Sequence, residues 1–170
     1  LFTALRGIYE PFNRHKKIIA FDTVAGFPEV VKEDGKHQMM FKGALKTHKD
    51  YEKFLEKILD IQEKMNPLSH IKKFEIVKGD AIKEFPKYIK KNPHTIVSLA
   101  FFDFDIYKPT KEILKMIKPR LVKGSIVAFD ELNDPDSPGE TLALMDTIGL
   151  NNIKLQKYPY ASRASYFVLD

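Results

Sequence analysis

The sequence predicts a doubly wound α/β fold, in which helices cover a mostly parallel sheet that ends in an antiparallel pair of strands. Short apolar runs of strand length alternate with segments whose apolar residues recur at helical spacing, and this alternation is typical of parallel sheets. The most apolar run lies within Thr95–Thr110, TIVSLAFFDFDIYKPT, and suits a strand covered on both faces. Several runs end in carboxylates, at the edge of the sheet where ligands bind in open α/β folds.

The N-terminal part of the chain begins with a predicted helix, a strand and a second helix. Leu1–Tyr9 has apolar residues at helical spacing. Ile18–Phe21 is a short apolar run that ends in Asp22, as expected of a buried strand. Lys49–Asn66 carries the apolar stripe of an amphipathic helix. The residues 23–47 between them predict a loop followed by a lid without clear periodicity.

The middle of the chain continues the alternation of strands and helices. Phe74–Val77 is the next predicted strand, and Ala81–Lys91 is a helix that Pro86 is expected to break or restart. After the central strand Ile96–Phe102, Pro109 stands where a further helix begins.

The C-terminal part adds a strand, a short helix and a closing pair of strands. These elements are the strand Ser125–Phe129 opened by Gly124, the helix Thr141–Ile148, and the strands Ile153–Tyr158 and Tyr166–Leu169. Because a short connection joins the last two strands, we expect them to be antiparallel.

The composition predicts one domain and excludes several classes of protein. The 170 residues are 44% hydrophobic, which is enough for a single core. The net charge of +5 comes from lysines spread along the chain without an Arg-rich stripe, so we expect no nucleic-acid partner. The absence of cysteine excludes disulfides and thiolate metal sites. No apolar segment has the roughly 18–20 residues that span a bilayer; we therefore expect no membrane partner and a cytoplasmic location.

Acidic residues follow four of the predicted strands, and these are Asp22, Asp80, Asp103 with Asp105, and Asp130 with Glu131. The exits of parallel strands meet at one edge, so we expect the carboxylates to converge. Oxygen ligands of this kind suit Mg²⁺ or another divalent cation rather than zinc. Asp103, Asp130 and Glu131 form the best metal-ligating group, because consecutive strands carry them.

A single acid after a strand is more often a helix N-cap or a solvated loop residue than a ligand. For Asp80, capping and ligand contact are equally expected, and for Asp105 holding the following turn is favoured. Asp22, at the end of an early strand, suits the hydroxyls of a ribose. Four acidic strand ends in one chain favour a functional site over four independent caps.

Four stretches together resemble the class I S-adenosylmethionine-dependent methyltransferases, and most closely the macrocin and mycinamicin O-methyltransferase (TylF-like) family. They are IIAFDTVAGFPE, IVKGDAIKEFPKYI, LAFFDFDIYKPTKEIL, and KGSIVAFDELNDP with the PGET that follows. The resemblance covers most of the chain from Ile18 to Thr141. It implies a Rossmann-like methyltransferase fold and a metal-assisted transfer of a methyl group from S-adenosylmethionine to a hydroxyl of a sugar or glycoside.

The resemblance also implies roles for individual residues. Asp22 would hold the cofactor ribose, and Gly79, Asp80 and Ala81 would contact the cofactor after the next strand. Asp103, Asp130 and Glu131 would bind Mg²⁺, and Asp103 would also be the catalytic base. Glu131 departs from the family pattern, in which the second acid of this pair is often aspartate.

The largest departure concerns the front of the fold. The first strand and the glycine-rich cofactor loop of the family would precede the helix at Leu1–Tyr9, so residues 1–170 are expected to be a single methyltransferase-like domain that lacks both. Two alternatives remain open: a sugar-nucleotide transferase that uses Asp103-Phe104-Asp105 as a DxD metal motif, and a non-catalytic methyltransferase-like binding module. The N-terminal helix and the lid could also form a subunit contact in a homo-oligomer.

Overall fold

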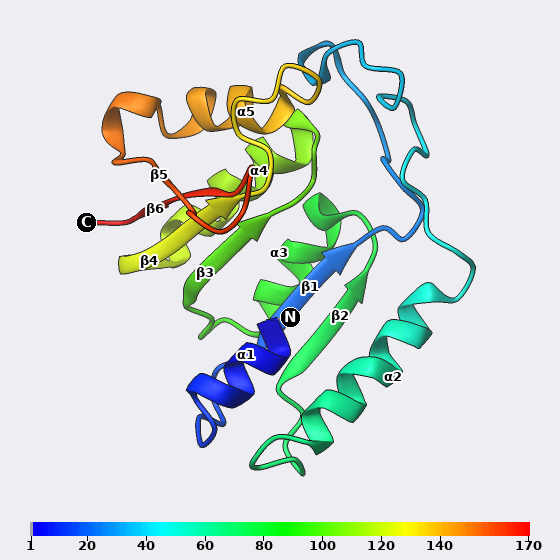
Figure 1. The fold of residues 1–170 in the computed structure, drawn as a ribbon, viewed down its shortest axis with the longest axis vertical. Coiled ribbons are helices and arrows are strands. Elements are labelled where there is room, and N and C mark those ends of the chain that lie inside the picture. The colour runs from blue at the N-terminus through cyan, green and yellow to red at the C-terminus, as the bar shows by residue number, and fades with distance from the viewer. Residues whose placement is uncertain (1) are drawn as a thin grey trace.

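The computed structural model describes residues 2–170, and its helices and strands follow the predicted order (Figure 1). The helices are α1 (Phe2–Tyr9), α2 (Tyr51–Lys64), α3 (Ala81–Lys91), α4 (Tyr107–Ile117) and α5 (Gly139–Thr147). The strands are β1 (Ile18–Asp22), β2 (Phe74–Lys78), β3 (Val97–Phe102), β4 (Leu121–Phe129), β5 (Gln156–Lys157) and β6 (Ser165–Val168). Leu1, the predicted first residue of the N-terminal helix, lies outside the described residues.

The strands form two separate sheets rather than the single sheet that the sequence predicts. β1 pairs in parallel with β2, and β3 pairs in parallel with β4. β6 pairs antiparallel with both β4 and β5, which confirms the predicted C-terminal antiparallel pair. Within residues 2–170, β1 and β3 do not pair, so a mixed α/β architecture is confirmed but a continuous doubly wound sheet is not.

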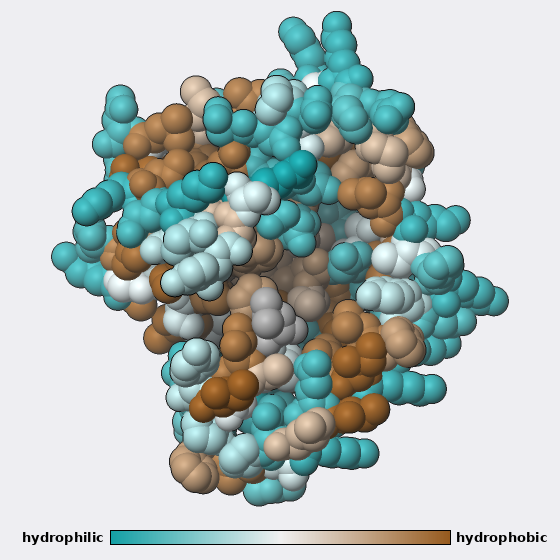
Figure 2. All heavy atoms as spheres, in the orientation of Figure 1, coloured by the Kyte–Doolittle hydropathy of each residue, from teal (hydrophilic) through white to brown (hydrophobic). Residues whose placement is uncertain are grey.

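The prediction that the central strand is covered on both faces is wrong. In β3, Phe102 is buried, but Leu99 and Phe101 are 44% and 40% exposed. Double coverage requires neighbours on both edges and both faces. Within the described part of the chain β4 is the only strand that pairs with β3, and the buried core lies on the Phe102 side. In the view of Figure 2, brown, apolar atoms lie around a hollow near the centre of the molecule.

The main core fixes β3 and β4 side by side. Its buried residues are Ala81, Phe85, Phe102, Ile113, Leu114, Ile117, Val127, Phe129, Leu144 and Phe167. The rings of Phe102 and Phe129, the last residues of β3 and β4, stack with their centroids 5.1 Å apart. The two strand exits that carry the acidic pairs are therefore held together by apolar packing.

Two local predictions are corrected by the structure. α3 runs without a break through Pro86, because Asp80 caps its first turn and Ala81 and Phe85 bury its apolar face. β4 starts before Gly124 rather than after it. Gly124 has φ of +86°, and it sits where the register between β3 and β4 shifts, so the glycine allows the strand to continue through an irregularity.

A buried group of charged residues joins α1, α2 and Lys73, which directly precedes β2. Glu63 of α2 accepts a hydrogen bond from Arg6 of α1 at 3.0 Å and lies 2.5 Å from the Lys73 Nζ atom. All three side chains are at most 5% exposed.

None of the helices described between residues 2 and 170 is long and apolar enough to cross a bilayer.

Candidate active site

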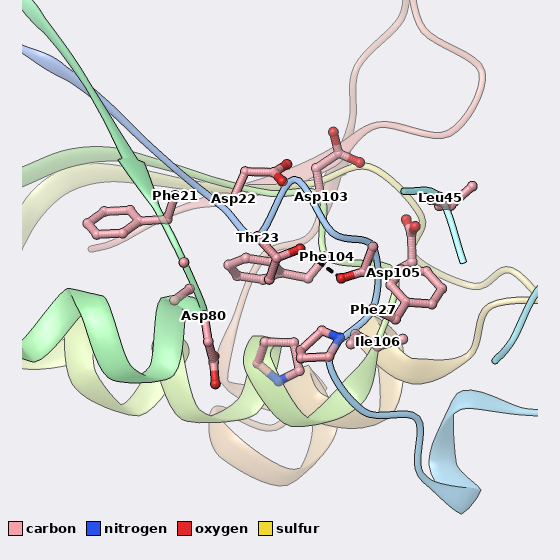
Figure 3. Close-up of a pocket in the computed structure, with 15 residues that line it drawn as sticks. Phe21, Asp22, Thr23, Phe27, Leu45, Asp80, Asp103, Phe104, Asp105 and Ile106 are labelled. Atoms are coloured by element: carbon pink, nitrogen blue, oxygen red, sulfur yellow. Dashed lines mark hydrogen bonds between the residues drawn. The ribbon is translucent and has the colours of Figure 1, made fainter. Parts of the chain in front are cut away.

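The exits of β1, β2 and β3 line a pocket of about 240 Å³ (Figure 3). β1 contributes Asp22, and the turn after β2 contributes Gly79–Ala81. The loop after β3 contributes Asp103–Ile106. The structure thus brings together the predicted cofactor-binding residues and the predicted catalytic base. Residues 26–28 and Leu45, from the predicted loop and lid, close the other side.

Asp22 is held by a tight turn that the following residues form. Its Oδ1 atom accepts a hydrogen bond from the backbone N–H of Val24, which has a left-handed φ of +51°. Gly26 is required here, because a Cβ atom would stand 2.1 Å from the carbonyl oxygen of Ala44. Figure 3 shows the carboxylates of Asp22 and Asp103 on the same side of the pocket.

Asp80 caps a helix, which is one of its two predicted roles. Its Oδ1 atom accepts a hydrogen bond of 3.0 Å from the backbone N–H of Ile82 at the start of α3. In Figure 3 its carboxylate points away from those of Asp22 and Asp103. The predicted contact of Gly79, Asp80 and Ala81 with a ligand stays a prediction.

The pKa values of the two acidic side chains at the exit of β3 are raised by burial and by neighbouring carboxylates. Burial raises the pKa of Asp103, and the nearby carboxylates of Asp130, Glu131 and Asp22 raise it further. Burial also raises the pKa of Asp105 to about 6, with Glu131, Asp103 and Asp130 as further causes. The carboxylates therefore lie close enough to repel one another, as expected for acids that share one sheet edge.

The prediction that Asp105 holds the following turn is wrong. Ile106 occupies the N-cap position of α4 and makes no side-chain capping bond, while Asp105 has a left-handed φ of +59°. The turn is held from elsewhere: Oδ1 of the buried Asp34 accepts a hydrogen bond of 2.6 Å from the backbone N–H of Tyr107. Asp105 is left as a second carboxyl group, beside Asp103, that the loop after β3 contributes to the pocket wall.

Asp130 and Glu131, at the exit of β4, do not line this pocket. The backbone N–H of Asp130 donates to the carbonyl oxygen of Phe102, which ties this exit to that of β3. Glu131 pairs with Arg163, which also lies 3.3 Å from Asp134. Sequence reasoning missed Arg163, because it comes from the connection between the last two strands.

The predicted metal ligands suit a divalent cation in their chemistry but not in their present positions. Asp103, Asp130 and Glu131 offer the oxygen donors that suit a hard divalent cation, and their mutual repulsion is of the kind that a cation relieves. As the side chains stand within residues 2–170, no three carboxylate or imidazole groups lie close enough together to hold one ion. The residues therefore fit a divalent cation in the type of their donor atoms, but the described side chains do not bring three donors to one point.

Two buried carboxylates near the pocket were missed by sequence reasoning. Glu140 and Asp34 are both 0% exposed, and both accept hydrogen bonds from backbone N–H groups. Burial raises the pKa of Glu140 to about 7. The sequence signal for Glu140 was its place in PGET, directly after the acidic loop, but an acid in the first turn of a helix is ordinarily solvated.

The raised pKa values predict how stability depends on pH in the metal-free protein. Asp105 and Glu140 titrate at about 6 and about 7 in the folded chain and at lower pH when unfolded, so between these limits the folded state binds more protons. We therefore expect the free energy of unfolding to fall as pH rises from about 4 to 7. The salt-bridged surface acids act in the opposite direction, mainly below about pH 4.

Urea unfolding in the presence of a chelator at a series of pH values measures this dependence. Asp105→Asn should make the fall with pH shallower, because it removes one of the groups with a raised pKa. Asp60→Asn, on the exposed surface of α2, serves as the control and should leave the slope unchanged. A free energy of unfolding that rises steadily from pH 4 to 7 would contradict the prediction.

Comparison with solved structures gives clear relatives. The chain is 39% identical to CalS11, a calicheamicin methyltransferase, with a TM-score of 0.94 over 98% of this chain and 65% of that one. An apo structure of CalS11, a TDP-rhamnose 3'-O-methyltransferase of calicheamicin biosynthesis, is 36% identical with a TM-score of 0.82, over 98% of this chain and 64% of that one. The chain therefore spans slightly less than two thirds of the length of these relatives.

A more distant structure shares the fold alone. The O-methyltransferase NovP is 17% identical, with a TM-score of 0.60 over 91% of this chain and 60% of that one. Neither a protein-family model nor a curated protein matches the chain.

Proposed function

We propose that this chain, a relative of the class I S-adenosylmethionine-dependent O-methyltransferases, carries the site of an enzyme that methylates a sugar hydroxyl. One observation carries the proposal: Asp22, Asp80 with Ala81, and Asp103 line the same pocket although they follow three different strands. The similarity to CalS11 over 98% of the chain supports it.

The acceptor that we propose is the hydroxyl of a sugar joined to a nucleoside diphosphate or to an aglycone. TDP-rhamnose is the sugar nucleotide in the name of the relative CalS11, and glycosides are the acceptors that the resemblance to the TylF-like family implies. A sugar offers neighbouring hydroxyls that carboxylates can orient through hydrogen bonds.

The cofactor would lie along the exits of β1 and β2. Asp22 presents a carboxylate that can accept hydrogen bonds from both hydroxyls of a ribose. Gly79, Asp80 and Ala81 form the wall against which an adenine would pack. S-adenosylmethionine, when bound, supplies an electrophilic methyl group on a positively charged sulfur.

Asp103 would act as the base that takes the proton of the acceptor hydroxyl. Asp103 lines the pocket, where it would lie beside a bound acceptor, and its raised pKa makes it a stronger base than a surface carboxylate. The proton of the hydroxyl would move to the Asp103 carboxylate as the bond from oxygen to the methyl carbon forms and the bond from sulfur to that carbon breaks, which would release S-adenosylhomocysteine. The neighbouring Asp105 adds another carboxyl group to this end of the pocket.

A divalent cation forms part of the proposal. Asp103, Asp130 and Glu131 would hold it, and their crowding of like charges is the observation in its favour. When bound, the ion lowers the pKa of the acceptor hydroxyl and orients its oxygen.

The organisation of the domain is also a proposal. We infer that residues 1–170 form one methyltransferase-like domain, and that the first strand and glycine-rich loop implied by the resemblance would lie between β1 and β3. Those two strands are parallel to their partners but do not pair with each other within residues 2–170, and Leu99 and Phe101 of β3 are exposed.

Methyl transfer is tested by incubating the protein with S-adenosylmethionine, Mg²⁺ and TDP-rhamnose, and by measuring the mass of the sugar nucleotide and of glycoside acceptors. We expect the mass of one methylene group to be added, and the addition to stop when a chelator is present. Cofactor binding by calorimetry is the companion measurement. Absence of both methyl transfer and cofactor binding would contradict the proposal and favour a non-catalytic binding module.

A further inference from the structure

A single buried carboxylate touches both of the loops that carry the acidic site residues. Glu140 lies in the first turn of α5, and its side chain is 0% exposed. Its Oε1 atom accepts a hydrogen bond of 3.0 Å from the backbone N–H of Phe104, which stands between Asp103 and Asp105. Its Oε2 atom accepts a bond of 3.5 Å from the backbone N–H of Glu131.

This carboxylate has no cationic partner to explain its burial. Within residues 2–170, Glu140 forms no salt bridge, and its hydrogen bonds come from the two backbone N–H groups. A buried carboxylate is unfavourable unless its oxygens are satisfied. The backbone N–H groups of Phe104 and Glu131 donate the hydrogen bonds that these oxygens need. The carboxylate and the two loops therefore hold each other in place.

The far end of the β3 loop is fixed in a similar way. Asp34 accepts hydrogen bonds from the backbone N–H groups of Tyr107 at 2.6 Å and Val31 at 2.7 Å. Gly139 lets the start of α5 come this close, because a Cβ atom there would stand 2.6 Å from the Tyr107 nitrogen. Asp105 lies between the two anchored points with its left-handed backbone.

We propose that Glu140 is a positioning residue, which ties the exit of β3 to the exit of β4 and thereby sets the separation of Asp103 from Asp130 and Glu131. The tether itself is independent of the proposed function; its consequence for methyl transfer rests on that function. Without the carboxylate the strand ends keep the backbone bond from Asp130 to Phe102, but the loops beyond them lose the side chain that joins them, and Asp103 shifts relative to the acceptor hydroxyl.

The test uses Glu140→Gln, which keeps the size of the side chain and one acceptor oxygen, and Glu112→Gln as the control. Glu112 is a surface residue of α4 that pairs with Lys115. We expect Glu140→Gln to lower kcat by about 100-fold, because small displacements of reacting groups have effects of this size. The KM for S-adenosylmethionine should stay close to that of the wild type, since Asp22 and Asp80 belong to other loops.

The second readout is hydrogen exchange at the backbone amides of Phe104 and Glu131, followed by NMR. In Glu140→Gln at least one of these amides should exchange faster and shift, while amides in β2 and α2 keep their protection. In Glu112→Gln both amides should behave as in the wild type. Exchange at these amides shows whether Glu140 holds the two loops even if the wild-type protein transfers no methyl group. Failure of the proposed function is therefore distinguishable from failure of this inference.

Two results would overturn the inference. One is unchanged exchange at Phe104 and Glu131 in Glu140→Gln. The other is a loss of protection spread evenly over the whole chain with kcat per folded molecule unchanged, which would make Glu140 a residue of general stability only.

Discussion

Asp103→Asn should lower the rate of methyl transfer by about 1,000-fold, which is within the range that a general base contributes. The amide side chain keeps the shape of the carboxylate but cannot take the proton of the acceptor. Affinity for S-adenosylmethionine should change little, because Asp22 and the Gly79–Ala81 turn form a different part of the pocket wall. Mass spectrometry of the acceptor gives the rate, and calorimetry gives the affinity.

The matched control for this variant is Asp60→Asn. Asp60 is on α2 and lies 3.9 Å from Lys72 on the surface, so the substitution should leave both quantities at their wild-type values. Asp130→Ala extends the test to the proposed metal, and it should also abolish turnover. A fully active Asp103→Asn protein would refute the role of the base, and an active Asp130→Ala protein that ignores chelators would refute the metal.

Glu63→Gln should lower the free energy of unfolding by about 3–5 kcal/mol, the usual effect of removing one partner of a buried charge pair. Glu63 is the only carboxylate that pairs with Arg6 and Lys73 within the described residues. Both cations stay buried after the substitution, and the Nε and Nη1 atoms of Arg6 already lack partners. Urea unfolding at pH 7 measures the change.

An exposed pair of similar geometry provides the control for Glu63. Glu56 lies 2.6 Å from Lys72 with both side chains about half exposed, so Glu56→Gln should change the free energy of unfolding by less than about 1 kcal/mol. Equal effects of the two substitutions would contradict the account, because burial would then make no difference.

The sequence predicted the pocket because its signals are local. An apolar run followed by an acid marks the exit of a strand, and parallel topology brings such exits to one edge, so Asp22, Asp80 and Asp103 could be placed together without coordinates. The helix limits were predicted within a few residues for the same reason. For example, the apolar stripe of Lys49–Asn66 became α2, Tyr51–Lys64.

The features that were missed depend on partners far away in the chain. Glu140 bonds to an amide 36 residues away, and Asp34 bonds to one 73 residues away, so no local pattern reports their burial. The exposure of β3 has a similar origin, because coverage of a strand is decided by its neighbours and not by its own apolar residues. The prediction that Pro86 breaks its helix was wrong for the opposite reason. It relied on a local signal, and the packing of α3 outweighs that signal.

A crystal structure of the protein with S-adenosylhomocysteine would address the arrangement of the site most directly. The ribose hydroxyls should bond to the carboxylate of Asp22, with the adenine beside Asp80 and Ala81 and the sulfur turned toward Asp103. A nucleoside bound at another surface, or ribose hydroxyls that do not reach Asp22, would contradict the account.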